Sequence, residues 1–156
     1  MLSYPIGSSG QSICFAPEVL AHFHRHRQTR WYHREAGGQL FATTAGLVLT
    51  IVEATGPRRS DRRTRVSYVP NRAAEASEIA DQQTRGRVFV GDWHTHPESV
   101  PNPSPLDQRS IQECFRKSTH GLNGFLLVIV GLAEFPDGLL VSVSDSERTH
   151  VLHPYS

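Results

Sequence analysis

Apolar positions along this chain follow two patterns, helical spacing in some segments and short runs typical of strands in others. Residues 17–27 carry apolar side chains at helical spacing and open with a proline, which suits the first turn of a helix, so we expect a helix there. Residues 38–44 and 47–53 are short apolar runs on either side of Gly46, and this pattern predicts two strands that turn at the glycine. No element is predicted before residue 17.

Each later element shows one of these two patterns and ends at a residue that interrupts regular secondary structure. The arginine-rich residues 56–65 are expected to form an exposed loop, and the four prolines within residues 97–105 a stiffened one. We expect, in order, a strand over 66–69, a helix over 71–84 capped by Asn71, a strand over 87–96, a helix over 105–117, and paired strands over 125–130 and 139–143. This order predicts a mixed α/β (α+β) fold, in which helices flank a mixed β-sheet.

Length and composition narrow the class of protein. A chain of 156 residues allows one compact domain, taken as residues 1–156. With 38% hydrophobic and 20% charged residues it is neither a disordered polyelectrolyte nor a membrane protein. The net charge of +1 gives no global field that would recruit nucleic acid or a membrane. No signal peptide or membrane span is visible, and we expect a cytoplasmic protein.

Thiol and amine chemistry have little support. Cys14 and Cys114 lie far apart and form no CxxC pair, so neither a disulfide framework nor a thiolate metal cage is suggested, and Cys114 is expected to be a small core residue. Lys117 is the only lysine, so covalent catalysis by a lysine amine has a single candidate.

The informative stretch is Gly-Asp-Trp-His-Thr-His-Pro at residues 91–97. Side chains alternate along a strand, so His94 and His96 project to one side and can share a metal ion, while Trp93 points into the core. Asp107 falls in the first turn of the next predicted helix and can supply a carboxylate as third ligand. Two imidazoles, one carboxylate and a water molecule in the fourth position describe a catalytic site with one Zn²⁺ ion.

Two further side chains would complete a metallohydrolase. Glu35 stands before the glycines of Glu-Ala-Gly-Gly-Gln-Leu, at the entry to a strand that can lie beside the histidines, and is the candidate general acid/base. Ser104 lies three residues before Asp107 and can direct its hydroxyl to an oxyanion. Ser104 and Asp107 also fit a helix capping box, which is a purely structural alternative.

Together these residues resemble a known motif. Glu35, His94-Thr95-His96, seven intervening residues and Ser104-Pro105-Leu106-Asp107 are similar to the JAMM motif of the MPN/JAB metalloprotease family, and residues 35–40 resemble the ExGGxL of its bacterial members. The resemblance covers about residues 17–143. Ala42 departs from it, because many bacterial members have glycine there.

The resemblance implies a fold, a cofactor and a substrate. The fold would be the MPN/JAB fold, related in outline to the cytidine deaminases, with zinc bound by His94, His96 and Asp107. The activity would be cleavage of peptide or isopeptide bonds after the tail of a ubiquitin-like protein, with Glu35 as acid/base and Ser104 as oxyanion stabiliser. The nearest resemblance is to short bacterial JAB proteins, some of which act in CBASS antiphage operons on conjugates of a CD-NTase-type nucleotidyltransferase.

Three alternatives remain open at this point. A non-catalytic MPN scaffold would bind partners only, although such members usually lack ligands. A nucleobase deaminase would also combine zinc, water and glutamate, but its cysteine pair is missing. A RadC-like JAB protein near DNA would use the arginines of residues 58–65 on phosphates, whereas a solvated loop is the expected role of those arginines.

A cluster of histidines at the first helix carries a weaker signal. His22 and His26 would share one helix face, and His24 and His33 lie nearby. No carboxylate or cysteine of evident role accompanies them. We therefore expect a solvated surface rather than a second metal site.

Overall fold

A computed structural model of the chain describes residues 1–117 and 123–156. These residues form one eight-stranded sheet, in the order β1-β2-β4-β3-β7-β8-β9-β10, and a separate β5–β6 hairpin. The strands are β1 (Leu2–Pro5), β2 (Ser12–Phe15), β3 (Gly37–Ala45), β4 (Val48–Ala54), β5 (Arg62–Arg63), β6 (Tyr68–Val69), β7 (Val88–Thr95), β8 (Phe125–Val130), β9 (Leu139–Ser144) and β10 (Thr149–Leu152). The helices are α1 (Pro17–Arg25), α2 (Arg72–Thr84) and α3 (Pro105–Lys117), and the predicted mixed α/β fold is confirmed.

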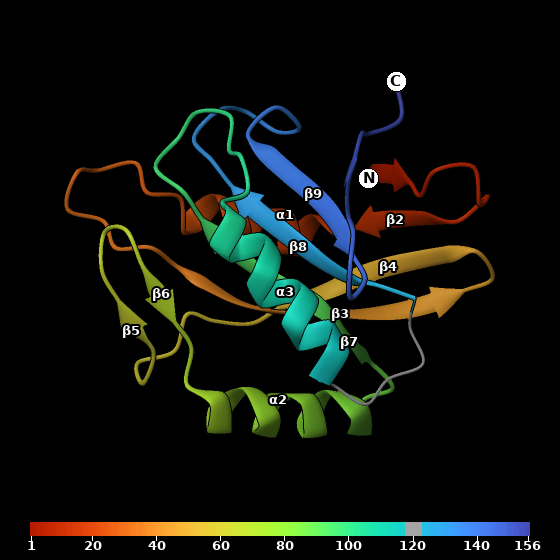
Figure 1. The fold of residues 1–156 in the computed structure, drawn as a ribbon, viewed down its shortest axis with the longest axis horizontal. Helices are drawn as coiled ribbons and strands as arrows, with labels where there is room; N and C mark the ends of the chain where they lie inside the picture. The colour runs from red at the N-terminus through yellow and green to blue at the C-terminus, as the bar shows by residue number, and fades with distance from the viewer. Residues whose placement is uncertain (118–122) are drawn as a thin grey trace.

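The centre of the sheet is mixed in direction. β3 runs antiparallel to both β4 and β7, whereas β7 runs parallel to β8, which can occur because α3 makes the crossover between them. Figure 1 shows α3 lying across one face of these strands, α1 behind them, and α2 below them in this view. The predicted strands other than 66–69 correspond to β3, β4, β7, β8 and β9, which form the middle of the sheet.

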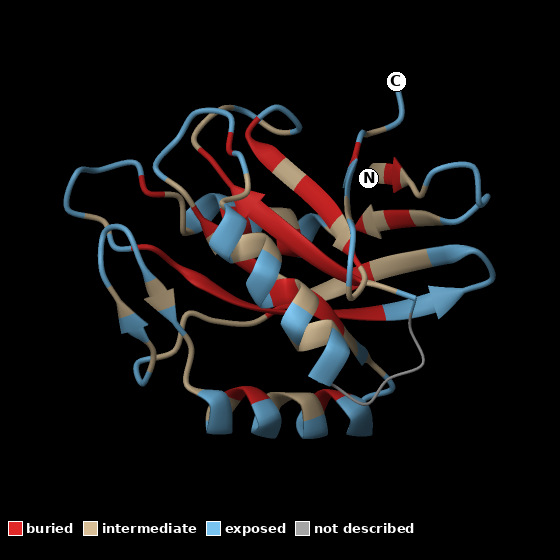
Figure 2. Cartoon of the chain, viewed as in Figure 1, coloured by how far each residue is buried: buried red, intermediate tan, exposed pale blue. Residues whose placement is uncertain are grey.

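Separate apolar clusters cover the two faces of the sheet. Phe23 of α1 packs on Trp93, with ring centroids 5.2 Å apart, and Trp93 is buried in the larger cluster as predicted. On the other face, Ile111 of α3 packs with Phe125 and other residues of β8. Figure 2 shows the buried residues along β8, along most of β9 and along the first part of β3. Because β8 is buried at every position, it has the uninterrupted apolar sequence of a central strand.

Side-chain caps fix the start of α2 and α3. The Asn71 side chain accepts a hydrogen bond of 3.0 Å from the Ala74 amide, as predicted for a cap. At α3, the Ser104 hydroxyl accepts from the Asp107 amide at 3.0 Å, and the Asp107 carboxylate accepts from the Ser104 amide at 2.9 Å. This reciprocal capping box orients the Asp107 side chain at the helix start.

The sequence did not predict the outer strands. β1, β2 and β10 have four residues each and lie at or near the two edges of the sheet, where few apolar positions are needed. Segments of four residues give only a weak alternation signal, and these three were not recognised. The expected strand 66–69 is also shorter, since only Tyr68–Val69 is extended.

The expectation that residues 56–65 are merely an exposed loop is wrong in part. Arg62–Arg63 forms β5, and Arg58 is largely buried. Arg58 forms ion pairs with Asp61 and with Glu78 of α2. The Asp61 carboxylate also accepts from the Tyr68 hydroxyl at 2.6 Å and from the Asn71 amide at 2.8 Å. Polar side chains, which a hydrophobic period cannot reveal, therefore hold this hairpin to α2.

The helices of the described residues are too short or too polar to cross a membrane.

Candidate metal centre

Strand β7 places both histidines on one face of the sheet. His94 pairs with Gly37 of β3 and with Ile129 of β8, so its backbone is fixed from both sides. The amide of His96 continues this pairing by donating to the Val130 carbonyl at 3.0 Å. The two imidazoles meet with their Nε2 atoms 3.2 Å apart. Alternation along a strand at the centre of the sheet is therefore enough to bring the two rings together.

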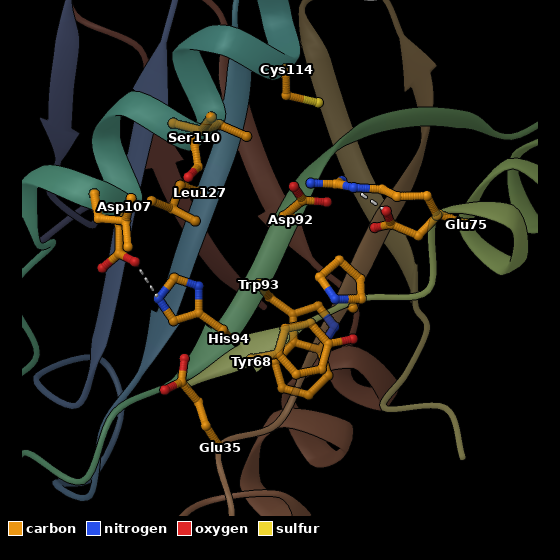
Figure 3. A pocket seen from close by; sticks show the side chains of 15 residues that line it. Glu35, Tyr68, Glu75, Asp92, Trp93, His94, Asp107, Ser110, Cys114 and Leu127 are labelled. Carbon is orange, nitrogen blue, oxygen red and sulfur yellow. Dashed lines mark hydrogen bonds and ion pairs between the residues drawn. The ribbon is translucent and has the colours of Figure 1, made fainter. Parts of the chain in front are cut away.

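Asp107 approaches the histidines from the start of α3. Its Oδ1 lies 3.4 Å from Nε2 of His94 and its Oδ2 lies 3.4 Å from Nε2 of His96 (Figure 3 shows the first of these contacts). The loop 97–104 brings the helix start back over the end of β7. The capping box described above then determines which way the carboxylate points.

These three side chains fit a zinc ion. Zinc with bonds of about 2.1 Å in tetrahedral geometry separates neighbouring ligand atoms by about 3.4 Å. The nitrogen–nitrogen separation of 3.2 Å agrees with that spacing, and each nitrogen has one Asp107 oxygen at 3.4 Å, Oδ1 for His94 and Oδ2 for His96. The nitrogen and oxygen donors are also those that zinc takes in hydrolytic sites. His96 Nδ1 has a further partner, the Glu98 carboxylate at 3.0 Å, which is the type of outer contact that orients a ligating ring.

Glu35 completes the group from a different part of the chain. It lies just before β3, is only 8% exposed, and offers a carboxylate oxygen within 4.8 Å of ligand atoms on His94 and His96. Its backbone is held by the hairpin, because its amide donates to the Thr64 carbonyl at 2.7 Å and its carbonyl accepts from Arg63 Nε at 2.7 Å. The structure thus brings all four predicted side chains together, and their division into ligands and acid/base stays a prediction.

The two carboxyl groups differ in their electrostatic surroundings. Burial raises the pKa of Glu35, and the neighbouring His94 and His96 oppose this only in part. Burial would also raise the pKa of Asp107, but hydrogen bonds from His94 and His96 lower it far below its ordinary value. The hydrogen bond to Asp107 in turn raises the pKa of His96. Glu35 therefore holds a proton more readily than an ordinary glutamate, whereas Asp107 ionises more readily than an ordinary aspartate.

A buried threonine joins the two halves of the site. The Thr95 hydroxyl accepts from the Ala36 amide at 2.9 Å and donates to the Gln28 side chain at 2.8 Å. Its amide also donates to the Ala36 carbonyl at 2.9 Å. Thr95 therefore fixes the residue that follows Glu35 against the strand that carries the histidines. The sequence analysis missed Thr95 and Gln28, although a polar residue pointing to the core face of β7 was a usable signal.

The glycines after Glu35 allow close packing. A Cβ atom on Gly38 would collide with the Thr55 carbonyl oxygen, which accepts a 2.8 Å hydrogen bond from Trp93 Nε1. A Cβ on Gly37 would come within 2.8 Å of the Trp93 carbonyl oxygen and of the Tyr68 ring. Side chains at these two positions would push β3 away from its neighbours, and Glu35 with it.

The other residues considered in the sequence are placed as follows. The Ser104 hydroxyl accepts from Asp107 but keeps its own proton for a second partner. The expectation of a solvated histidine surface is wrong for His22 and His26, which are half-buried with ring centroids 5.4 and 6.0 Å from that of Trp93. Among the described residues, these histidines belong to no cluster able to hold a metal ion. Cys114 is half-buried and lines a cavity beside the metal centre.

That cavity, of about 180 Å³, lies between β7, α2 and α3. His94, Asp107 and Glu35 line it, and so do Asp92 and Glu75, which the sequence analysis did not consider. Burial, followed by the neighbouring Glu75 carboxylate, raises the pKa of Asp92 to about 7. Figure 3 shows Glu35, His94 and Asp107 together at one side and Asp92 and Glu75 at the other.

Helices cover both faces of a mixed sheet, and a cluster of histidines and carboxylates lies at the end of a central strand. This combination is the one that the motif predicts for a JAB protein. Residues 17–142 match the family described as prokaryotic homologs of the JAB domain, and the chain belongs to that family. A solved protein of Desulfitobacterium hafniense has the same fold, with a TM-score of 0.61 at 18% identity over 89% of this chain and 88% of that one.

Relatives whose names state a function are more similar in sequence. A "CD-NTase/cGAS isopeptidase" of Escherichia coli (strain TW11681) is 34% identical over 101 residues, which are 63% of this chain and 65% of that protein. A protein of the same name from Pseudomonas aeruginosa is 34% identical over 113 residues, 69% of this chain and 70% of that protein. A "Probable metalloprotease y4qB" of Sinorhizobium fredii is 32% identical over 110 residues, 67% of this chain and 66% of that protein. The match thus spans just under two thirds of the E. coli and Sinorhizobium relatives.

Proposed function

We propose that this protein is a zinc-dependent isopeptidase or peptidase of the JAMM type. The observation that carries the proposal is the convergence of two imidazole nitrogens and a carboxylate at the spacing of a zinc coordination sphere, with a second, buried carboxylate beside them. The membership in the JAB family and the relatives named isopeptidase and metalloprotease support a hydrolase.

In this proposal, His94, His96 and Asp107 hold the metal. Asp107 suits the role of ligand because it lies at the same distance from both rings and stays ionised. Zinc bound there supplies Lewis-acid activation, since it lowers the pKa of a coordinated water molecule and polarises a carbonyl. Glu98 holds the His96 ring in the orientation that presents Nε2.

Glu35 and Ser104 act on the substrate. Glu35 takes the proton of the water molecule that attacks the scissile carbonyl carbon, and gives it to the amine nitrogen as the carbon–nitrogen bond breaks. A raised pKa makes its carboxylate a stronger base and its acid form available for the second step. The Ser104 hydroxyl donates to the carbonyl oxygen while negative charge develops there, and its oxygen keeps accepting from the Asp107 amide. The products are a carboxylic acid and a free amine.

The proposed substrate is a protein conjugate. It is a bond after the C-terminal tail of a ubiquitin-like protein, with a CD-NTase-type nucleotidyltransferase as conjugated target, which the names of two relatives suggest. The antiphage setting is the one that the motif resemblance implies. The proposed place of action is the cytoplasm, with residues 1–156 as one JAB domain. The alternative of a DNA-associated RadC-like protein has less support, because Arg58 and Arg63 already bind groups of the protein itself.

The test uses purified protein loaded with one equivalent of zinc. It is incubated with a candidate ubiquitin-like modifier, presented both as a linear fusion and as a lysine-linked conjugate to a nucleotidyltransferase. Cleavage of either bond, lost with a chelator and restored by zinc, is the expected result. Zinc-loaded protein that leaves both bonds intact would argue against the peptidase, and protein that binds no zinc would favour a non-catalytic scaffold.

A further inference from the structure

An exposed basic and aromatic surface borders the metal centre. It is formed by the loop 26–36, between α1 and β3, and by the hairpin 61–69, which lie next to each other at the left of Figure 1. Trp31 is 77% exposed, Tyr32 60% and Val66 82%. Contiguous exposed side chains of this kind mark interaction sites. We name this region the basic aromatic surface, and its members are Arg30, Trp31, Tyr32, Arg34, Arg65 and Val66.

The loop that carries the two aromatic rings is held in place although the rings are exposed. Gln28 is buried, and its side-chain amide donates to the Arg65 carbonyl at 2.9 Å, which joins the loop to the hairpin. The Arg30 amide donates to His33 Nδ1 at 3.2 Å, and the His33 amide donates to the Arg30 carbonyl at 3.0 Å. A fixed turn therefore presents the rings, so that a partner can bind them with little further loss of conformational entropy.

The three arginines of this surface have no acidic partner. None of them forms an ion pair within the part of the chain that the structure describes. The loop and the hairpin contain two acids, Glu35 and Asp61, and both carboxyl groups are turned away from solvent. Burial, followed by the neighbouring Arg34 guanidinium, lowers the pKa of Arg63, so like charges meet here. The missing complement is a carboxylate, which arginine binds through two parallel hydrogen bonds.

A hollow in this surface provides a place for one apolar side chain. Its volume is about 160 Å³, and two arginines of the surface line it together with apolar residues, namely Trp31, Val66, Pro97 and Leu132. Pro97 directly follows His96, so the hollow adjoins the end of the strand that carries the histidines. The occupant that fits is an apolar side chain flanked by carboxylates.

The geometry of the rings favours a protein partner over a nucleic acid. The Trp31 and Tyr32 rings meet at 90°, with centroids 5.8 Å apart, and the Arg65 guanidinium lies over the Trp31 ring at 5.9 Å from its centroid. Single strands bind on open ring faces that stack successive bases, and a perpendicular, partly covered pair does not offer this. Tryptophan, tyrosine and arginine are, in contrast, the residues enriched at the centres of protein interfaces.

We propose that the basic aromatic surface binds the conjugated target protein, through an acidic segment with an apolar residue near the modified lysine. The inference rests on the proposed function, to which it adds a docking surface on the amine side of the bond. Glu35 gives its proton to the departing amine, so that nitrogen lies beside Glu35. Arg34 directly precedes Glu35, and Arg63 of the hairpin donates to the Glu35 carbonyl at 2.7 Å. A chain attached to the nitrogen therefore leaves the site across this surface.

The first measurement is binding, which requires no turnover. The acetylated peptide Glu-Asp-Leu-Lys-Leu-Asp-Glu and its neutral analogue Gln-Asn-Leu-Lys-Leu-Asn-Gln are titrated into the full chain, with and without zinc. NMR follows the indole N–H groups of Trp31 and Trp93, the two tryptophans of the chain. We expect the acidic peptide to shift the Trp31 signal saturably and to leave that of buried Trp93 unchanged. The neutral analogue should bind about tenfold more weakly, because charge complementarity is lost.

Variants of this surface are compared by calorimetric titration of the acidic peptide. Trp31→Ala should weaken binding about tenfold, as the loss of an interface anchor does. Arg65→Glu should weaken it about tenfold by placing like charges together, and it tests the surface independently if Trp31→Ala fails to fold. The matched controls are Tyr155→Ala and Arg148→Glu, at exposed positions outside this surface, which should bind as the native chain does.

The second measurement compares cleavage of isopeptide conjugates that carry the acidic or the neutral peptide, first on the amine side of the bond and then on the acyl side. On the amine side, kcat/KM should favour the acidic peptide about tenfold through KM, and Arg65→Glu should bring this ratio close to one. On the acyl side the ratio should be near one in both proteins. Cleavage of the neutral conjugates should not change in Arg65→Glu.

Several results would overturn the inference. They are equal binding of the two peptides, native binding in Arg65→Glu, a preference for acidic residues on the acyl side only, and tighter binding of an oligothymidylate probe than of the acidic peptide, which would indicate a nucleic acid as partner. Selective binding of the acidic peptide without any cleavage would instead count against the proposed function alone.

Discussion

Two regions of the molecule meet at the candidate metal centre, and they are held in place by different kinds of interaction. The histidines lie on β7, a central strand paired on both sides and packed between apolar clusters. Glu35 is held by residues 61–69, a hairpin outside the main sheet that is fixed by ion pairs and side-chain hydrogen bonds. The metal-binding half is therefore as rigid as the core, while the acid/base half depends on a polar support that can change without unfolding the domain.

This difference implies that metal binding and turnover can be separated by mutation. Damage to β7 or to the start of α3 should remove both properties. Damage to the hairpin should reduce turnover alone. The following predictions test this comparison, from the largest expected effect to the smallest.

The ligands and the acid/base should differ most clearly. His94→Ala should lose both bound zinc and activity, because two remaining donors hold zinc poorly. Glu35→Gln should keep one zinc per chain and lose about a thousandfold in kcat, the size expected for a lost general base. Zinc content by mass spectrometry, measured with the cleavage rate, checks both, and His153→Ala at an exposed position is the control. Loss of zinc from Glu35→Gln would make Glu35 a ligand.

Thr95 joins the two regions, so its loss should affect stability as well. Thr95→Val would leave the Ala36 amide and the Gln28 side chain without their buried partner. We expect the free energy of unfolding to fall by about 2–3 kcal/mol. Denaturant unfolding measures this. Thr43→Val, at an exposed position of β3, should change it by less than about 0.5 kcal/mol, and a similar loss in both variants would contradict the assignment.

Arg63 tests the hairpin alone. Arg63→Ala removes the donor to the Glu35 carbonyl, and the carboxylate should lose its fixed position. We expect kcat to fall about tenfold, as for a misplaced reacting group, with zinc content unchanged. Arg62→Ala, at the exposed neighbouring position, provides the comparison. A variant with native kcat would show that the hairpin does not position Glu35.

The smallest expected effect is a dependence of the free energy of unfolding on pH. Burial alone would raise the pKa of Asp61, but hydrogen bonds from the Tyr68 hydroxyl and two amides lower it below its ordinary value. Ionised Asp61 therefore stabilises the fold above the ordinary aspartate pKa of about 4, and this contribution is lost as the pH falls further. Asp61→Asn should cost about 1 kcal/mol at pH 7 and clearly less at pH 3, as measured by urea unfolding. An equal cost at both pH values would be evidence against this role.

The part of the site that the sequence revealed is the part set by local geometry. His94 and His96 follow from alternation along one strand, and Asp107 from the start of a helix with a recognisable cap. Glu35 was chosen from its place before two glycines at the entry to a strand, and the resemblance supported that choice, because no local rule links it to histidines so distant in sequence. The ligand roles of these residues remain predictions.

The sequence could not reveal contacts between segments that are distant along the chain and meet only in the fold. Arg63 and Arg58 belong to a run of arginines that looks solvated until α2 and Glu35 are placed against it. Asp92 stands within the recognised motif, yet only the fold places it at one cavity with Glu75 of another helix. The short edge strands went unnoticed because their stability comes from their neighbours in the sheet and not from their own sequence.

The reciprocal hydrogen bonds between Ser104 and Asp107 restrict what can stand at the helix start. One carboxylate closes the first turn of α3 and also faces two imidazoles, and its reach is set by a single methylene group. A glutamate at this position would keep the charge, but its longer side chain could satisfy either the turn or the rings, not both together. Replacing Asp107 by glutamate would therefore change the function of this protein, even though both side chains are carboxylic acids.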